Sequence, residues 1–188
     1  MKSFVSRFPK RKGAAVLAIA ALAVCLPLGL RALTHETVYV DGSLAYYSVD
    51  DLVAGSTLVV SGTITGEPES LRVHHASADM ETNFTDYTLA VETVYRGQAA
   101  GETLTVRIYG GTAGNVTEIY SPAPQLTAGE EYLLFLNQPG MGGAFNTPGD
   151  YYYLTGVTQG VFQEDTAGGY TSQSGDPLSP AVSWGAGL

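Results

Sequence analysis

The chain of 188 residues is long enough for one domain with accessory segments, and its charges are unevenly divided. Six of its nine Lys and Arg residues precede residue 32, whereas all eighteen Asp and Glu residues follow it. From Ala32 onward, three arginines therefore face eighteen carboxylates, which gives a net charge of −15. Because phosphate binding depends on clusters of Lys and Arg, this charge excludes nucleic acid as a partner and disfavours anionic lipid surfaces. The only cysteine, Cys25, lies in the apolar leader, so the rest of the chain cannot form an internal disulfide.

The N-terminus carries the pattern of an export or anchoring segment. Residues 1–12 are basic and are predicted to be cytoplasmic, and residues 13–30 contain no charge. As a helix, these eighteen residues would cover about 27 Å, close to the hydrocarbon thickness of a membrane. The segment is either a signal anchor or a signal peptide cleaved after Ala23, and we favour the anchor because cleavage there leaves an apolar new terminus. Both alternatives predict an extracytoplasmic domain, membrane-anchored or secreted, that touches the membrane only through this segment.

The next residues predict a connecting segment and a short helix. Residues 31–47 are interpreted as a tether or an edge segment, because THETVYV has some alternation. Ser48 can cap a helix over residues 48–55, and Gly55 can end it. Asp50 and Asp51 lie in its first turn, where the helix dipole is positive and favours carboxylates.

Alternation with a period of two residues predicts an all-β domain over residues 48–164. The longest alternating run, Thr85–Tyr95, would extend roughly 36 Å, enough to bend around a small barrel. A bulge is expected at Gly62. The Gly, Pro and Thr-rich connection Gly110–Gly129 is predicted to be a functional or partner-facing loop, and residues 165–188 a polar C-terminal tail. The expected strands are residues 57–65, 85–95, 102–109, 131–136 and 151–155.

Three segments together resemble a group of exported bacterial domains. They are residues 51–64 (DLVAGSTLVVSGTI), 91–97 (VETVYRG) and 126–136 (LTAGEEYLLFL). More distantly, their order is similar to that of netrin-like and metalloproteinase-inhibitor-like (TIMP-like) modules. The resemblance implies a five-stranded OB-like Greek-key barrel, here with a short N-terminal helix and preceded by an N-terminal hydrophobic helix. Inhibitory members of the wider group chelate the zinc of their target through an N-terminal cysteine. The domain has no such cysteine, so that mechanism is not carried over.

No residue pattern identifies a catalytic or metal centre. His74 and His75, with Asp79 and Glu81 downstream, are the best metal candidates. Adjacent side chains of a strand point in opposite directions, however, and we interpret the pair as solvated loop histidines. The sequence contains no nucleophile-elbow or P-loop motif. Its paired carboxylates are adjacent in sequence, and the start of a helix or a strand explains them better than general acid–base catalysis. We therefore predict that the protein is not an enzyme and uses no catalytic residue, metal or cofactor.

The tyrosines are the best sequence evidence for binding. All twelve lie beyond residue 38, and Tyr151, Tyr152 and Tyr153 are consecutive, so that at least one ring should reach the surface. Tyrosine is common in adaptable binding surfaces, and small OB barrels bind ligands on strands two and three and the adjoining loops. We predict a module that binds an envelope or extracellular protein. The alternatives are neutral-glycan or cell-wall binding and, third, a structural accessory subunit of an envelope complex. The candidate binding residues are Tyr87, Arg96, Arg107, Tyr109, Tyr151, Tyr152 and Tyr153.

Overall fold

The computed structural model describes residues 34–75, 79–139, 147–166 and 169–178. The chain divides into two units, Met1–Glu36 and Thr37–Leu188, and nearly all described residues belong to the second. The predicted anchor at residues 13–30 lies outside the described residues. Within the described ranges, no helix has the length and apolar character needed to cross a membrane.

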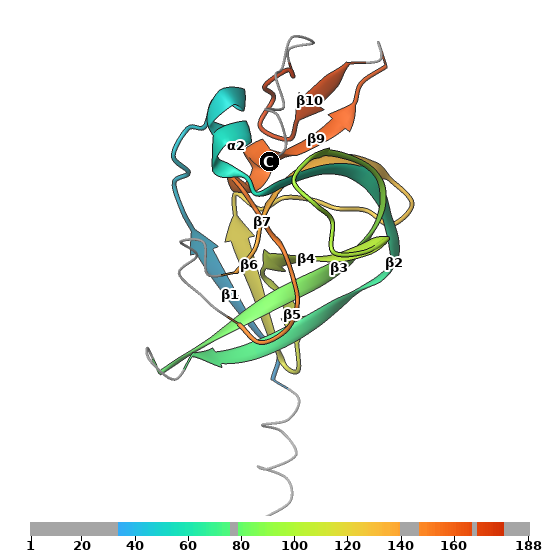
Figure 1. Cartoon of the computed structure of the whole chain (residues 1–188). Coiled ribbons are helices and arrows are strands. Elements are labelled where there is room, and N and C mark those ends of the chain that lie inside the picture. Colours follow the sequence, from blue (N-terminus) through green and yellow to red (C-terminus); the bar gives the residue numbers. More distant parts are fainter. Residues whose placement is uncertain (1–33, 76–78, 140–146, 167–168, 179–188) are drawn as a thin grey trace, which may run out of the picture. The chain divides into compact units, whose positions relative to one another are not determined.

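The described part of the chain is mostly β, which confirms the predicted all-β class (Figure 1). One sheet has the strand order β10-β9-β7-β2-β3-β4, with β8 paired to β7, and the other has the order β1-β6-β5. The elements are β1 (Glu36–Asp41), α2 (Val49–Gly55), β2 (Leu58–His75), β3 (Met80–Arg96), β4 (Thr103–Tyr109), β5 (Gly111–Ala113), β6 (Val116–Ser121), β7 (Glu131–Asn137), β8 (Tyr153–Leu154), a 3-10 turn η1 (Val157–Gly160), β9 (Val161–Glu164) and β10 (Tyr170–Ser172).

The described strands do not close into a single barrel, in contrast to the five-stranded barrel expected from the sequence. The reason lies in the last expected strand, residues 151–155, of which only Tyr153 and Leu154 pair with β7. Its contact with β4 is an isolated parallel bridge between Val106 and Tyr152. Two backbone hydrogen bonds support that bridge, from Arg107 N to Tyr152 O and from Tyr152 N to Thr105 O, each 2.8 Å long.

The predicted helix is present as α2, and its cap is the one the sequence indicates. The Ser48 hydroxyl accepts a hydrogen bond from the Asp51 amide at 3.2 Å, and the Asp51 carboxylate accepts one from the Ser48 amide at 3.0 Å. Together these bonds form a capping box. Leu52 and Val53 on the opposite face are buried against β7 and β9.

β2 and β3 form a hairpin that is longer than the sequence predicts. The pairing continues to His75 opposite Met80, so that most of the polar segment after Thr65 is strand. Its side chains are largely exposed, so the pairing with β3, rather than burial, holds it in place. The register shifts between Ser61 and Gly62, which confirms the predicted bulge. A side chain at Gly62 would overlap the carbonyl oxygen of Ala90, so the hairpin requires glycine there.

The core lies on both faces of the β2–β7 pair. Val60 and Leu134 face one cluster of buried side chains, whereas Val59 and Phe135 face the other, as alternation in two adjacent strands requires. β7 lies between β2 and β9, which explains why its sequence is apolar on both faces.

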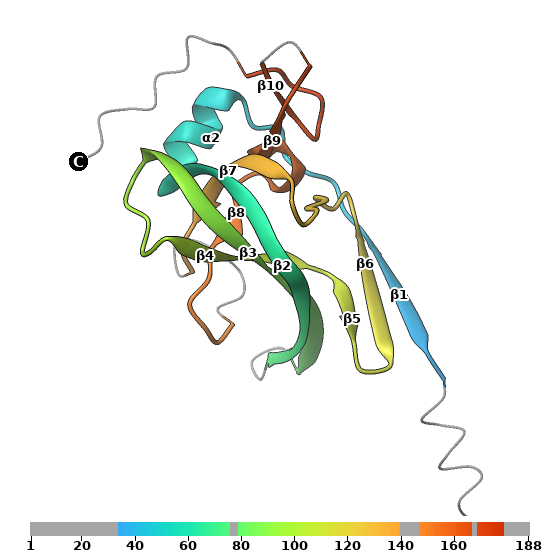
Figure 2. The same ribbon diagram turned by 90° about the vertical axis from the view of Figure 1, so that its right-hand side faces the viewer.

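The small sheet corrects the interpretation of residues 110–129 as a loop. This segment contains the hairpin of β5 and β6, and β6 also pairs with β1 (Figure 2). Residues 31–47 were expected to form a tether or an edge segment, and β1 is an edge strand within this range. The pairing with β6 continues one residue beyond β1, where the Gly42 amide donates to the Ser121 carbonyl at 2.8 Å. The sequence did not indicate the hairpin because β5 is short and rich in glycine and threonine, and β6 depends on a strand distant in sequence.

The segment after residue 165 also contributes to the large sheet. Tyr170–Ser172 forms β10 and pairs antiparallel with β9. The Leu178 amide then donates to the Tyr170 carbonyl at 2.7 Å, so the described part of the predicted tail is folded onto the domain.

Candidate functional site

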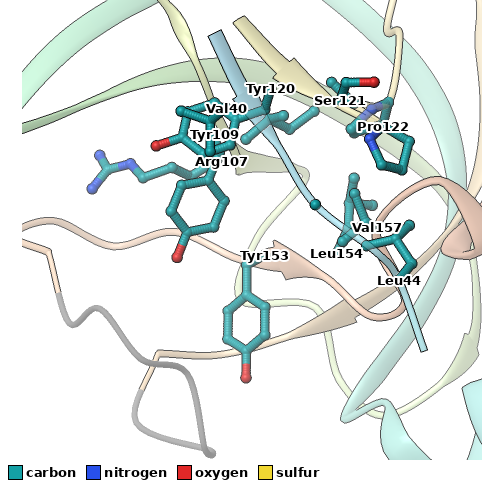
Figure 3. A pocket seen from close by; sticks show the side chains of 14 residues that line it. Val40, Leu44, Arg107, Tyr109, Tyr120, Ser121, Pro122, Tyr153, Leu154 and Val157 are labelled. Atoms are coloured by element: carbon teal, nitrogen blue, oxygen red, sulfur yellow. The ribbon is translucent and has the colours of Figure 1, made fainter. Parts of the chain in front are cut away.

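An apolar cavity of about 180 Å³, which we name the tyrosine pocket, lies where the small sheet meets the edge of the large sheet. Figure 3 shows its side chains, with the blue chain running through the view from Val40 in β1 to Leu44 beyond the strand's end. Two prolines that follow β6 line one part of the pocket, and residues of β8 and η1 line another part. The lining residues are Val40, Gly42, Leu44, Arg107, Ile108, Tyr109, Tyr120, Ser121, Pro122, Ala123, Pro124, Tyr153, Leu154 and Val157.

Tyr109 and Tyr120 form a pair of rings beside this pocket. Their centroids are 5.4 Å apart, and the Tyr109 ring also lies 5.0 Å from that of Phe84. Burial raises the pKa of Tyr109 to about 12, with smaller contributions from Tyr151 and Tyr153. Burial also raises the pKa of Tyr120 to about 12, and the nearby Glu118 carboxylate adds to this shift. Both hydroxyls therefore stay protonated at neutral pH and can donate hydrogen bonds.

Arg107 lines the pocket, and its side chain also stabilises the fold through hydrogen bonds. Its Nε and Nη2 atoms each donate to the Asp86 carboxylate at 2.7 Å, and Nη1 donates to Thr147 Oγ1 and to the Pro148 carbonyl. Its guanidinium carbon lies 4.1 Å from the centre of the Tyr151 ring. The hydrogen bonds with Asp86 raise the pKa of Arg107 and outweigh its burial. The guanidinium thus fixes the segment at residues 147–148 and has little capacity left for a ligand.

The three consecutive tyrosines have different environments. Tyr151 and Tyr152 are each only 6% exposed, and Tyr153 is half-buried and lines the pocket. The Tyr151 hydroxyl accepts a hydrogen bond from the Thr147 amide at 3.1 Å, so this residue helps to hold the chain at residue 147. Tyr153 is thus the ring of this run that reaches the surface, and burial raises its pKa.

A second hollow of about 250 Å³, which we name the side pocket, also includes Tyr109 and Tyr120 in its lining. Tyr87, Tyr109 and Tyr120 contribute rings to it, next to polar side chains. Its lining residues are Thr85, Tyr87, Ile108, Tyr109, Gly110, Gly111, Thr117, Glu118, Ile119, Tyr120, Ala123, Pro124 and Gln125.

The structure brings four of the seven predicted site residues to the two pockets, whereas Arg96, Tyr151 and Tyr152 line neither. Arg107, Tyr109 and Tyr153 line the tyrosine pocket, and Tyr87 lines the side pocket, where burial raises its pKa. Arg96 lies in neither lining, and its Nε donates to the Ser56 carbonyl at 3.1 Å near the end of α2.

Sequence reasoning missed two parts of the tyrosine pocket. Val40 and Leu44 belong to the segment interpreted as a tether or edge, and Tyr120 with the following prolines belongs to the predicted loop. The available signal was the run Tyr120–Pro124, in which an aromatic residue and two prolines follow alternating residues. Only the pairing of β1 with β6 brings these segments together.

The two candidate metal ligands do not lie in a loop. His74 and His75 end β2; the His74 side chain is exposed, with Nε2 4.0 Å from Asp79 Oδ1, whereas His75 is buried. The His75 ring lies 6.2 Å from that of Phe84 in an edge-on arrangement. The interpretation as solvated loop histidines is therefore wrong for His75, because the hairpin extends further than its polar sequence suggests. Within the described ranges, no group of three or more His, Cys, Asp or Glu residues is placed to hold a metal ion.

Comparison of the chain with protein-family models, curated proteins and solved structures finds no match. The chemistry of the two pockets is therefore the basis for assigning a function.

Proposed function

We propose that this chain is a non-catalytic binding module that acts outside the cytoplasmic membrane and binds a protein at the cell envelope. The observation that carries the proposal is the tyrosine pocket, an apolar cavity at the junction of two sheets with three tyrosines in its lining. Tyrosine offers a large, rigid contact surface and a hydrogen-bonding hydroxyl, which suits the side chains of a protein partner.

The ionisable groups of the pocket support a binding role over catalysis. General acid–base catalysis at neutral pH works best with a group whose pKa lies near 7. The tyrosine pocket contains Arg107, whose pKa is raised by Asp86, and three tyrosines whose pKa values are raised by burial. All four groups therefore keep a single protonation state near neutral pH.

Site-specific crosslinking in intact cells tests the proposal. The full chain is expressed in a bacterial host with the photoreactive residue p-benzoylphenylalanine in place of Tyr153, at the tyrosine pocket. The matched control carries it in place of the exposed Glu102, which lines neither hollow. We expect a defined adduct with an envelope protein from the Tyr153 position and none from Glu102. Recovery of the chain alone from both positions would count against protein binding.

Neutral-glycan or cell-wall binding is a second candidate, and the side pocket favours it. Three tyrosine rings stand there beside Thr85, Glu118 and Gln125, and sugars are typically bound by such combinations of flat rings and hydrogen-bonding groups. Titration of the full chain with soluble cell-wall fragments tests this candidate. Tyr87→Ala should weaken glycan binding, whereas the same change should leave the Tyr153 crosslink intact. Absence of binding by the unmodified chain would remove the candidate.

We also propose that β2, β3, β4, β7 and β8 form a partly open OB-like barrel, in keeping with the resemblance to exported bacterial and netrin-like domains. The support is the pair of backbone hydrogen bonds that joins β4 to Tyr152, next to the β7–β8 pairing. Amide exchange measured by NMR tests it. Tyr152 and Arg107 amides should exchange as slowly as those of the β2–β7 pair, and exchange at loop rates would refute the barrel.

Extracytoplasmic display through residues 13–30 rests on the basic segment before this uncharged run. An alkaline phosphatase fused to the C-terminus should be active only if the domain is exported. Mass spectrometry of the mature N-terminus then distinguishes a signal anchor from a cleaved signal peptide.

A further inference from the structure

β1 presents an open edge whose central residues, Val38, Tyr39 and Val40, are apolar and exposed. All six of its residues are exposed, and its one described strand partner is β6. Of the ten exposed large hydrophobic residues in the described part of the chain, six lie between Val38 and Tyr47. Natural sheets usually protect such edges with proline, lysine or a bulge, because an open edge pairs readily with another chain. β1 contains neither proline nor lysine, and its charged residues, Glu36 and Asp41, lie only at its two ends.

A second open edge in the same domain shows the usual protection. Beyond Thr65, β2 pairs with β3 on one side, and this part of the strand contains Glu67, Pro68 and Glu69. Charges and proline disfavour pairing with a further strand. The contrast indicates that the β1 edge is suited to a partner strand, whereas the β2 extension resists one.

The direction of the backbone groups in β1 identifies those available to a partner. The Gly42 amide donates toward β6, to the Ser121 carbonyl. Because amide groups alternate in direction along a strand, those of Val40 and Val38 face β6. The amide and carbonyl groups of Thr37, Tyr39 and Asp41 then face the open edge.

The same strand borders the tyrosine pocket. Val40 lines the pocket, whereas the next side chain, Tyr39, is 72% exposed on the opposite face. Residues directly opposite each other in paired strands project from the same face of the sheet. An added strand would therefore place a side chain beside Val40, at the pocket. The cavity of about 180 Å³ is lined mainly by apolar atoms, so an apolar side chain fits it.

Charge identifies the kind of partner. Two of the three arginines in the described residues are held by carboxylates, Arg72 by Glu81 and Arg107 by Asp86, each with a contact of 2.7 Å. Most of the eighteen carboxylates therefore lack a basic neighbour within the domain. β1 itself ends in an acidic residue, Asp41. A basic partner is attracted to this surface, and an acidic one is repelled.

We propose that β1 pairs with an extended segment of a basic protein, which adds a strand to the small sheet and places an apolar side chain in the tyrosine pocket. This inference rests on the proposed protein-binding function and specifies the partner's chemistry. Backbone hydrogen bonds supply affinity in this mode of recognition, and the pocket supplies specificity.

The test uses the full chain in detergent and a fluorescent peptide, Lys-Lys-Val-Thr-Val-Thr-Val-Lys-Lys, whose binding is followed by anisotropy. Two matched peptides carry either Glu in place of every Lys or N-methyl groups on alternate amides. We expect the basic peptide to bind at least about tenfold more tightly than either, a difference of about 1.4 kcal/mol. Equal binding of the N-methylated peptide, equal binding of the acidic peptide, or no binding of the basic peptide would overturn the proposal.

Two variants of one residue separate backbone pairing from ring contact. Tyr39→Pro removes an amide that faces the open edge, and Tyr39→Ala removes the ring but keeps that amide. We expect Tyr39→Pro to weaken peptide binding about tenfold and Tyr39→Ala about threefold or less. Circular dichroism checks that both variants fold, and the N-methylated peptide tests the same bonds on the unmodified chain.

The outcomes also distinguish this inference from the function on which it rests. An adduct at Tyr153 whose yield is unchanged by Tyr39→Pro would overturn strand pairing and leave protein binding intact. Failure to capture any partner would overturn the binding function itself. Dimerisation of the full chain that Tyr39→Pro abolishes would assign the β1 edge to a second copy, and so overturn the basic partner.

Discussion

The ion pair between Asp86 and Arg107 should contribute strongly to the stability of the domain. The Arg107 side chain is 6% exposed and that of Asp86 is 21% exposed. Two charge-assisted hydrogen bonds of 2.7 Å join them across β3 and β4, at residues that lie directly opposite each other. Asp86→Ala removes the carboxylate and leaves an unpaired guanidinium on a side chain that is only 6% exposed.

Removal of one partner from a buried ion pair costs about 3–5 kcal/mol in unfolding free energy. Arg107 retains its bonds to Thr147 and Pro148, and Asp86 is partly exposed, so we expect about 3 kcal/mol for Asp86→Ala. Asp86→Asn keeps the shape and one acceptor, and should cost about 1.5 kcal/mol. The double variant Asp86→Leu with Arg107→Met removes both charges and should be more stable than Asp86→Ala, because no buried charge remains unpaired.

Urea unfolding of the full chain, followed by far-UV circular dichroism, measures these differences. With a slope of about 2 kcal/mol/M, a loss of 3 kcal/mol lowers the midpoint by about 1.5 M. A midpoint for Asp86→Ala within about 0.25 M of the unmodified chain would refute the reasoning, since it would mean that solvent screens the pair. A double variant less stable than Asp86→Ala would show that packing, rather than an unpaired charge, dominates.

Three further predictions use the same unfolding measurement. Gly62→Ala should cost about 3 kcal/mol because the new methyl group meets the Ala90 carbonyl, whereas Gly66→Ala, where no atom is near, should cost less despite its positive φ of 71°. Ser48→Ala should cost about 1 kcal/mol by removing the cap of α2, and Ser48→Asp should restore most of it. Burial raises the pKa of Tyr109 and Tyr120 to about 12 from 10.0, so their contribution to stability is complete below pH 10 and lost as the pH rises toward 12. Above pH 10, the double Phe variant should therefore lose less stability than the unmodified chain, and an equal loss would contradict burial of the two hydroxyls.

The parts of the fold that the sequence could predict depend on local patterns. The capping box of α2 is a contact between residues three positions apart, and the bulge at Gly62 follows from a glycine within a run of β-branched residues. β7 could be recognised as central because Glu131–Leu136 is apolar on both faces. Each of these features is determined by neighbours in the chain, so one sequence suffices to find it.

The parts that could not be predicted depend on distant segments. Nothing in Val116–Ser121 indicates that its partner is Glu36–Asp41, and without that partner the segment resembles a loop. The burial of Tyr151 and Tyr152 could not be predicted for the same reason, because it depends on how other segments pack against them. Arg107 was expected on a binding surface, since the sequence does not show that Asp86 lies opposite it.

The small sheet is held in place by buried polar contacts, which bears on how it would bind. Asn83, fully buried in β3, donates through Nδ2 to the carbonyls of Gly111 and Val116, and its amide donates to the Glu118 carboxylate at 3.0 Å. Thr85 donates to the Gly110 carbonyl at 2.8 Å. The segment expected to be a long loop is therefore fixed to β3 at four points. A partner strand that pairs with β1 would meet an ordered sheet, so the domain itself loses little conformational entropy on binding.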